Sequence, residues 1–196
     1  MREMLEEWEN GGRRGLCPVP DEPTPAGGGS GAGRAFSVQR YGMLEWGDLF
    51  TARQKVALVT LGGWTRDFSK GDAHGLHGVL LAALSRCADH WSAGAMWIQN
   101  LEAVAHTFGR QALPVVWDFV EACGFGDGGA VWRGQIDWVA RVIERLCVEG
   151  IGQVQAADST DHPLPDHAAG VWFTDPPYYD AVPYADLSDF FFVWCG

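Results

Sequence analysis

The sequence predicts an α/β fold in which a long helical region leads into a small sheet near the carboxyl terminus. Apolar residues recur at helical spacing in three stretches between residues 46 and 150, and two short β-type runs follow after residue 150. Both runs end in an aspartate. Because α/β sheets bind ligands at the carboxyl ends of their strands, we expect a site at these tips.

Composition limits the class of protein. A chain of 196 residues that is 47% hydrophobic can bury one core, and its ten tryptophans and ten phenylalanines argue against disorder. No apolar run reaches the roughly 18 residues that span a bilayer, and the amino terminus lacks the apolar core of a signal peptide. We therefore expect a cytoplasmic protein with no membrane partner. The net charge is −11, and the sequence has no basic stripe. It therefore offers no obvious surface for binding the phosphate backbone of a nucleic acid.

The cysteines indicate reduced thiols, because an odd number of them is scattered without a C-x-x-C pair. They are Cys17, Cys87, Cys123, Cys147 and Cys195. A zinc site built from them is not expected. His74 and His77 with Cys87 lack the second ligand pair that such a site needs, so we predict no metal.

Residues 1–35 are predicted to form the end of a helix and a linker. "MREMLEEWEN" fits a helix, and "GGRRG" breaks it. Residues 17–33 are first proline-rich and then glycine-rich, which is typical of an extended linker that becomes flexible. The glycine run 27–33 lacks the preceding strand and the lysine of a phosphate-binding loop, so we interpret it as an ordinary loop.

Residues 36–150 are predicted to be a helical region. The first helix covers residues 46–68, with Asp48 or Thr51 as its cap. The second covers residues 74–91 and the third residues 133–150, where Gly150 ends it. The stretch between the second and third helices is less regular, and Pro114 should break or begin an element there. The residues predicted to point inward are Leu49, Val56, Val59, Val79, Leu80, Ala83 and Leu84.

Residues 151–196 are predicted to hold the sheet. "GQVQAAD" (152–158) and "GVWFTD" (170–175) look like strands joined by a proline-containing loop, which places Asp158 and Asp175 at strand tips. The ending "YADLSDFFFVW" looks like the start of a helix with an aromatic, core-facing side.

The stretch "TDPPYY" at the tip of the second predicted strand contains the residues that could bind a substrate. Pro176 and Pro177 fix their own φ angles and restrict the residue before each, so the loop leaving the strand is stiff. The Asp175 carboxylate and the Pro176 carbonyl are two acceptors, which match the two donors of an exocyclic NH2 group. The ring of Tyr178 can stack on a heterocycle for roughly 1–3 kcal/mol. This combination suits an amino-bearing base taken out of a duplex.

"DPPY" after a hydrophobic run resembles the catalytic motif of S-adenosylmethionine-dependent amino-group DNA methyltransferases. Together with "QRYGMLEWGDLFTARQKVALVTL" and "HTFGRQALPVVWDFVEA", it resembles the prokaryotic adenine-specific DNA methylases described as containing a zinc ribbon. The resemblance covers most of the chain from about Val19 onward. It implies a partial Rossmann-like methyltransferase fold with a large helical insertion before the catalytic strand, and DNA as the partner of the full-length parent.

The resemblance also implies roles for individual residues. Asp175 and the Pro176 carbonyl would accept hydrogen bonds from the target amino group, so that its nitrogen can attack the sulfonium methyl, and Tyr178 would stack on the flipped base. Asp158 matches a position near the adenine of the cofactor, with a simple loop or cap role as its alternative. Tyr179, Asp180 and Tyr184 are candidates for the target pocket. The alternative for "DPPY" is a turn in which Asp175 caps the following helix.

The glycine-rich cofactor motif is not found in its expected place. The resemblance places it upstream of these residues. The one internal candidate, "CGFGDGGA" with Gly124, Gly126 and Gly128, falls in the inserted helical region and is not expected to be the cofactor loop. Paired zinc-ribbon cysteines are also missing, and relatives continue beyond the last helix. We therefore expect an internal fragment that by itself has little or no activity.

The substrate stays open at this point. The resemblance favours methylation of adenine in DNA, in restriction–modification or phage defence. The same two acceptors would serve cytosine, RNA or a protein glutamine, since each offers an amino group. A third alternative is a helical interaction module or an inactive remnant. The recognition sequence and the oligomeric state do not follow from the sequence.

Overall fold

The computed structural model describes residues 1–12, 17–28, 31–68, 70–71, 75–146, 155–158, 160–161 and 163–195. The elements of the described chain, in order, are α1 (Arg2–Asn10), η1 (Gly31–Ala35), η2 (Val38–Tyr41), η3 (Trp46–Leu49), α2 (Ala52–Phe68), α3 (Leu76–Trp91), β1 (Trp97–Ile98), β2 (Ala103–Val104), α4 (Trp132–Arg145) and α5 (Tyr184–Phe192), where η marks a 3₁₀-helix. The structure is therefore mixed helical with one small sheet.

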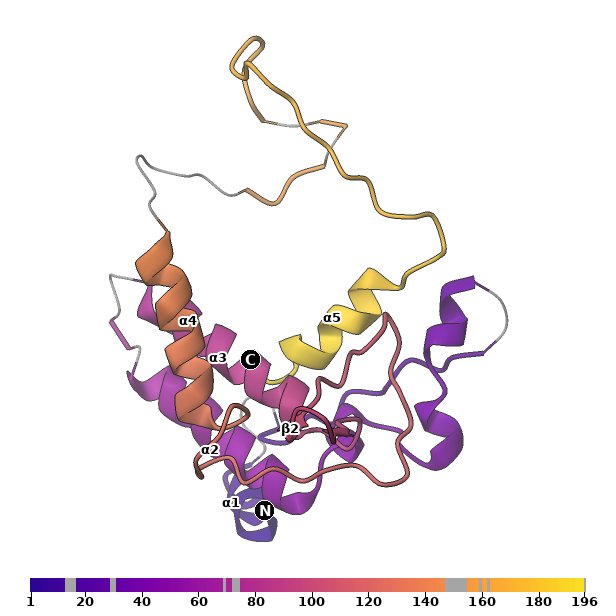
Figure 1. Cartoon of the computed structure of the whole chain (residues 1–196), viewed down its shortest axis with the longest axis vertical. Coiled ribbons are helices and arrows are strands. Elements are labelled where there is room, and N and C mark those ends of the chain that lie inside the picture. Colours follow the sequence, from indigo (N-terminus) through magenta and orange to yellow (C-terminus); the bar gives the residue numbers. More distant parts are fainter. Residues whose placement is uncertain are drawn as a thin grey trace.

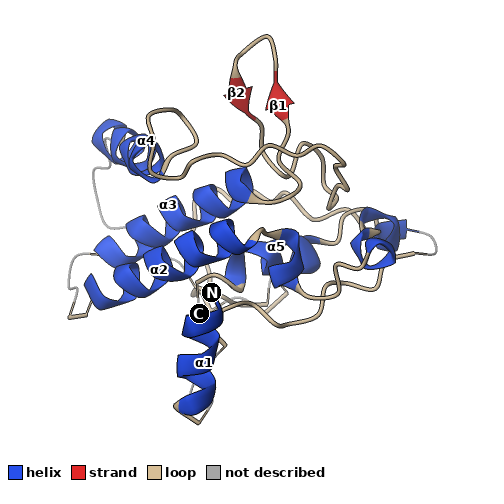
Figure 2. Ribbon diagram, turned by 90° about the horizontal axis from the view of Figure 1, so that it is seen from below, coloured by secondary structure: helices blue, strands red, loops and turns tan. Residues whose placement is uncertain are grey.

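Helix α3 lies at the centre of the fold. It packs against α2, α4 and α5, and Figure 2 shows α2 and α3 side by side with α4 at one edge. The apolar residues of α3 recur at spacings of three and four, so one face of the helix is buried. The predicted inward positions Ala83 and Leu84 are fully buried, and Cys87, Ala88 and Trp91 continue the same face.

Helix α5 is attached to this core by aromatic side chains. Phe190 is 0% exposed, and its ring centroid lies 5.6 Å from Phe50, 5.0 Å from Phe108 and 6.1 Å from Trp46. Trp194, just past the end of α5, meets Phe50 edge to face at 4.8 Å. The predicted aromatic helix is confirmed. Offset and edge-to-face pairs of this kind add about 0.5–1.5 kcal/mol each to the burial of the rings.

The start of α2 distinguishes the two predicted caps. The Thr51 N–H donates to Gln54 Oε1 at 2.8 Å, and the Gln54 N–H donates to Thr51 Oγ1 at 3.3 Å. This reciprocal pair satisfies two amides at the start of the helix. Asp48 instead accepts the N–H groups of Leu44 and Glu45 at 2.9 and 3.0 Å, at the start of η3. The predicted helix 46–68 is thus a 3₁₀ turn followed by α2.

The amino-terminal linker is extended, as predicted, but its described part is held in place. Between residues 20 and 24 it bonds to residues 44–47, with Thr24 N to Leu44 O at 2.9 Å and Gly47 N to Pro20 O at 2.9 Å. A Cβ on Gly47 would lie 2.7 Å from the Pro20 oxygen, so only glycine permits this approach. These bonds concern the proline-rich part of the linker, and the flexibility predicted for the glycine-rich part that follows stays a prediction.

The predicted carboxyl-terminal sheet is not formed in the described residues. Residues 155–158 and 170–175 contain no strand, and residues 152–154 lie outside the described part. Phe173 is 91% exposed. A strand is stabilised by the N–H and C=O groups of a neighbour, and here neither segment has one. The described residues therefore form no Rossmann-like sheet, and the strand predicted at residues 170–175 is absent.

The sheet that is present was not predicted. β1 and β2 pair antiparallel, with Trp97 opposite Val104 and Ile98 opposite Ala103. Helix α4 confirms the third predicted helix, while its predicted end at Gly150 lies outside the described residues. None of the described helices has the length and apolar character needed to cross a bilayer.

Truncation of Phe190 tests the attachment of α5. We expect Phe190→Ala to lower the free energy of unfolding by about 3–5 kcal/mol, because it removes a fully buried ring. Phe192→Ala, two residues away on the same helix and 72% exposed, should change it by no more than about 0.5 kcal/mol. Urea unfolding followed by tryptophan fluorescence measures both. Equal effects would contradict the described packing.

Candidate functional site

The predicted catalytic residues lie in a long exposed segment before α5. Figure 1 shows the described parts of residues 155–183 as a loop, orange to yellow, that extends away from the helices and returns at α5. All of residues 163–181 are exposed, and the rings of Tyr178 and Tyr179 are 72% and 100% exposed. No described residue bonds to the Asp175 carboxylate. The two predicted acceptors, Asp175 and the Pro176 carbonyl, are therefore accessible.

The structure argues against the cap alternative for Asp175. Helix α5 begins at Tyr184 with Pro183 at its N-cap and without a side-chain cap hydrogen bond. Asp175 lies eight positions before the N-cap Pro183. Asp180, another residue of the predicted pocket, has a left-handed φ of 49°, which turns the chain toward the helix. Tyr184 is exposed on the first turn of α5.

Asp158 is bonded within its own turn. Its Oδ1 accepts the N–H and the hydroxyl of Thr160, both at 2.8 Å, in a local turn. The Thr160 N–H, and then its hydroxyl, lower the pKa of the Asp158 carboxyl below its usual value. Neither of these hydrogen bonds reaches the predicted catalytic stretch, so the proximity of Asp158 to the cofactor stays a prediction.

The stretch with G-x-G-x-G spacing has a packing role. A Cβ on Gly124 would lie 2.6 Å from the Trp91 ring, so the backbone can cross this ring only at a glycine. The Trp91 Nε1–H donates to Ala130 O at 2.6 Å, and the Trp132 N–H donates to Gly124 O at 2.9 Å. The first bond holds residues 124–130 against α3. The second holds Trp132, the first residue of α4. Packing accounts for Gly124 without a cofactor.

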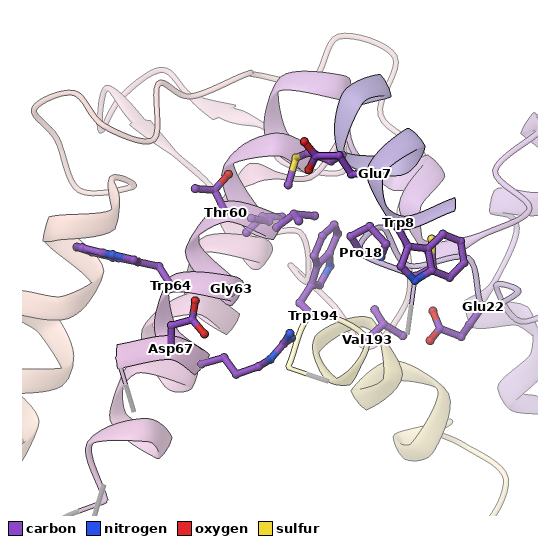
Figure 3. Close-up of a pocket in the computed structure, with 16 residues that line it drawn as sticks. Glu7, Trp8, Pro18, Glu22, Thr60, Gly63, Trp64, Asp67, Val193 and Trp194 are labelled. Atoms are coloured by element: carbon purple, nitrogen blue, oxygen red, sulfur yellow. The ribbon is translucent and has the colours of Figure 1, made fainter. Parts of the chain in front are cut away.

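A cavity of about 850 Å³ opens between α1, the linker, α2 and the end of α5. Its volume falls in the range of small-molecule sites. Figure 3 shows Trp194 between the α2 side, with Trp64 and Asp67, and the side formed by Trp8 and Pro18. The indole N–H of Trp194 is buried and has no acceptor among the described residues.

The chemistry of the cavity is acidic and aromatic. Glu7, Glu22 and Asp67 line it, together with the cation Arg66. Lys70, outside the lining, pairs with Asp67 at 2.7 Å, and Lys70 and then Arg66 lower the pKa of that carboxyl. Burial raises the pKa of the Cys17 thiol, and nearby carboxylates raise it further against an opposing backbone hydrogen bond at Val19. Cys17 therefore stays protonated at neutral pH and is a poor nucleophile.

The cavity and the predicted catalytic stretch are at opposite ends of α5. The stretch precedes Tyr184, while Val193 and Trp194 reach the cavity after the helix has ended. Nine helical residues span about 13 Å. The cavity is therefore not next to the predicted acceptors. Sequence reasoning placed Trp194 in the core, but a cavity assembled from four separate segments leaves no pattern in the sequence.

Comparison with protein-family models, with curated proteins and with solved structures gave no match for this chain.

Limited proteolysis tests the exposure of the predicted catalytic segment. We expect chymotrypsin to cut first after Trp172, Phe173, Tyr178 or Tyr179, because proteases need extended, accessible backbone. Phe192 is equally exposed as a side chain but is helical, so it should be cut later. Mass spectrometry of the early fragments gives the order. First cleavage after Trp91 or Phe190 would contradict the structure.

The role of Gly124 is tested by a matched pair of glycine variants. Gly124→Ala should destabilise the fold by about 1–3 kcal/mol, because the added methyl group overlaps the Trp91 ring. Gly129→Ala, in the same turn with no atom near its Cβ position, should have little effect. Thermal unfolding of both variants measures the difference. Equal stability of the two would show that Gly124 does not pack as described.

Proposed function

We propose that this chain provides the amino-group-binding part of an S-adenosylmethionine-dependent methyltransferase that acts on adenine in DNA. One observation carries the proposal: the D-P-P-Y sequence of residues 175–178 is exposed, with the Asp175 carboxylate free of described partners, ahead of a helix fixed in the core. A structural turn would have used the carboxylate locally. The likeness to amino-group methyltransferases gives the reaction class.

The proposed chemistry depends on two hydrogen-bond acceptors and one aromatic ring. The Asp175 carboxylate and the Pro176 carbonyl accept the two hydrogens of an exocyclic amino group. These bonds draw the N–H bonds toward the acceptors and leave the nitrogen lone pair less conjugated with the ring, which makes the nitrogen a better nucleophile. The two prolines limit the movement of the acceptors, so less ordering is needed when the base binds. Tyr178 stacks on the base, as is usual for extruded bases.

The described residues do not form a site that fits the cofactor. Asp158 is exposed and bonded to Thr160, and the acidic cavity lies at the far end of α5. We therefore derive no step through S-adenosylmethionine. The exposed β-type residues Val171, Trp172 and Phe173 favour a sheet that forms when this segment pairs with further strands. Such pairing would cover their side chains and fix the tip at Asp175.

The same proposal implies where DNA binds, which base is methylated and in which compartment. A chain with a net charge of −11 leaves DNA binding to other parts of the parent protein. The family resemblance favours adenine and a role in restriction–modification or phage defence, and DNA methylation in a prokaryote takes place in the cytoplasm. Cytosine, RNA or protein glutamine as substrate, and an inactive interaction module, are the competing hypotheses.

Substitution of Asp175 tests the proposal. The reading frame that contains the chain, with its flanking sequence, is expressed in a host without DNA adenine methylation, and nucleosides from plasmid DNA are analysed by mass spectrometry. We expect N6-methyladenine, and Asp175→Ala should reduce it on the order of 100-fold, because a charged group that stabilises the reacting centre is lost. Asp166→Ala, an exposed aspartate of the same segment, should leave it unchanged.

Each other outcome contradicts part of the proposal. Equal methylation by both variants would show that Asp175 is not the acceptor. N4-methylcytosine in place of N6-methyladenine would replace the substrate but keep the role of Asp175. A folded protein that methylates neither DNA nor RNA nor protein would favour the interaction module.

A further inference from the structure

Three side chains capable of binding a metal come together at the carboxyl end of α3, away from the residues of the proposed function. Asp89 and His90 lie in the last turn of α3, and His106 follows β2. One possible ligand atom from each lies within 4.8 Å of those from the other two. The two imidazole rings are 4.4 Å apart between centroids, and His106 Nδ1 is 2.6 Å from Asp89 Oδ2.

Backbone hydrogen bonds hold this cluster in place. The Thr107 N–H donates to Asp89 Oδ1 at 3.1 Å and also to Asp89 O at 2.8 Å, and the Thr107 hydroxyl donates to Asp89 O at 2.6 Å. Thr107 itself is buried against Ser92, with the two hydroxyls 2.5 Å apart. The residue before Thr107 is therefore fixed beside α3. The core therefore positions Asp89, His90 and the backbone of His106, while the His106 ring itself is about half exposed.

The buried imidazole has the tautomer that a metal ligand needs. His90 is 7% exposed, and its Nδ1 lies 2.8 Å from the Arg86 carbonyl oxygen. A carbonyl only accepts, so Nδ1 carries the proton and Nε2 of the neutral ring keeps its lone pair. A backbone carbonyl on the second ring nitrogen is also the usual outer partner of metal-binding histidines.

We propose that Asp89, His90 and His106 bind one divalent transition-metal ion of the Zn²⁺ type. His90 binds through Nε2. At His106 the ion takes the place of the hydrogen bond between Nδ1 and Asp89 Oδ2, and the exposed ring carries its proton on Nε2 instead. Ligands of a tetrahedral zinc ion are about 3.4 Å apart, so the three atoms need to move by only about 1 Å. The exposed His106 ring, on a side chain 53% exposed, can make this movement.

The donor set selects the kind of ion. Two imidazole nitrogens and one carboxylate suit Zn²⁺ and related first-row ions, whereas Mg²⁺ and Ca²⁺ prefer oxygen ligands. Three protein ligands leave a fourth position, and the exposure of His106 opens that position to solvent. The nearby Arg86 guanidinium is engaged by Gln135 of α4, with Nε 2.6 Å from Oε1. One carboxylate then offsets part of the charge of the ion.

Zinc titration of the untagged, chelator-treated chain tests the site. We expect calorimetry at pH 7.5 to give one zinc ion per chain, and His106→Gln to weaken binding at least about tenfold. His167→Gln, an exposed histidine outside the cluster, is the matched control and should bind like the wild type. Added zinc should raise the melting temperature of the wild type and of His167→Gln but not of His106→Gln.

A second variant separates loss of a zinc ligand from loss of folding. Asp89→Asn keeps hydrogen-bonding capacity toward residues 106–108 but removes the charge, so it should fold and bind zinc more weakly. Visible absorption of the Co²⁺-substituted chain reports the ligands directly, and its bands should change in both cluster variants. Wild-type zinc affinity in a folded His106→Gln chain, or equal loss of affinity in His167→Gln, would overturn the proposal.

Discussion

The packing of Phe190 against three rings from two other parts of the chain is the contact on which the arrangement of this chain depends. Trp46 and Phe50 lie in and directly after η3, and Phe108 follows the β1–β2 hairpin, so one side chain joins the carboxyl-terminal helix to both of these parts. This contact fixes the end of the exposed segment that carries Asp175. The segment therefore returns to a defined place although its described middle has no regular structure.

The helices could be predicted from the sequence because their signals are local. Apolar spacing identified α2 to α5, and Thr51, one of the two predicted caps, does start α2. The strands could not, because a strand depends on a partner that local sequence does not specify. The run at residues 170–175 has β-type composition without a neighbour, while the real hairpin has two residues per strand, too few to show a period.

The candidate sites also differ in whether their residues are close together in the sequence. The proposed acceptors of D-P-P-Y are consecutive residues, so the sequence alone could suggest them, whereas the walls of a substrate pocket depend on distant segments. Asp89 and His106 are 17 residues apart, and only the turn back through β1 and β2 brings them together. Gly124 had a motif-like spacing, yet the Trp91 ring beneath it explains the glycine. Spacing alone does not separate a binding glycine from a packing one.

The exposed residues 163–181 lie between α4 and α5, which both belong to the folded body, and this has a consequence for the length of the chain there. Closing a chain between two fixed points costs only about 0.6 kcal/mol more each time its length doubles. Insertions or deletions between residues 163 and 170, where all side chains are exposed, would then hardly change the stability of the helical body. Homologues are expected to differ in length here while Phe190 and its ring partners stay aromatic.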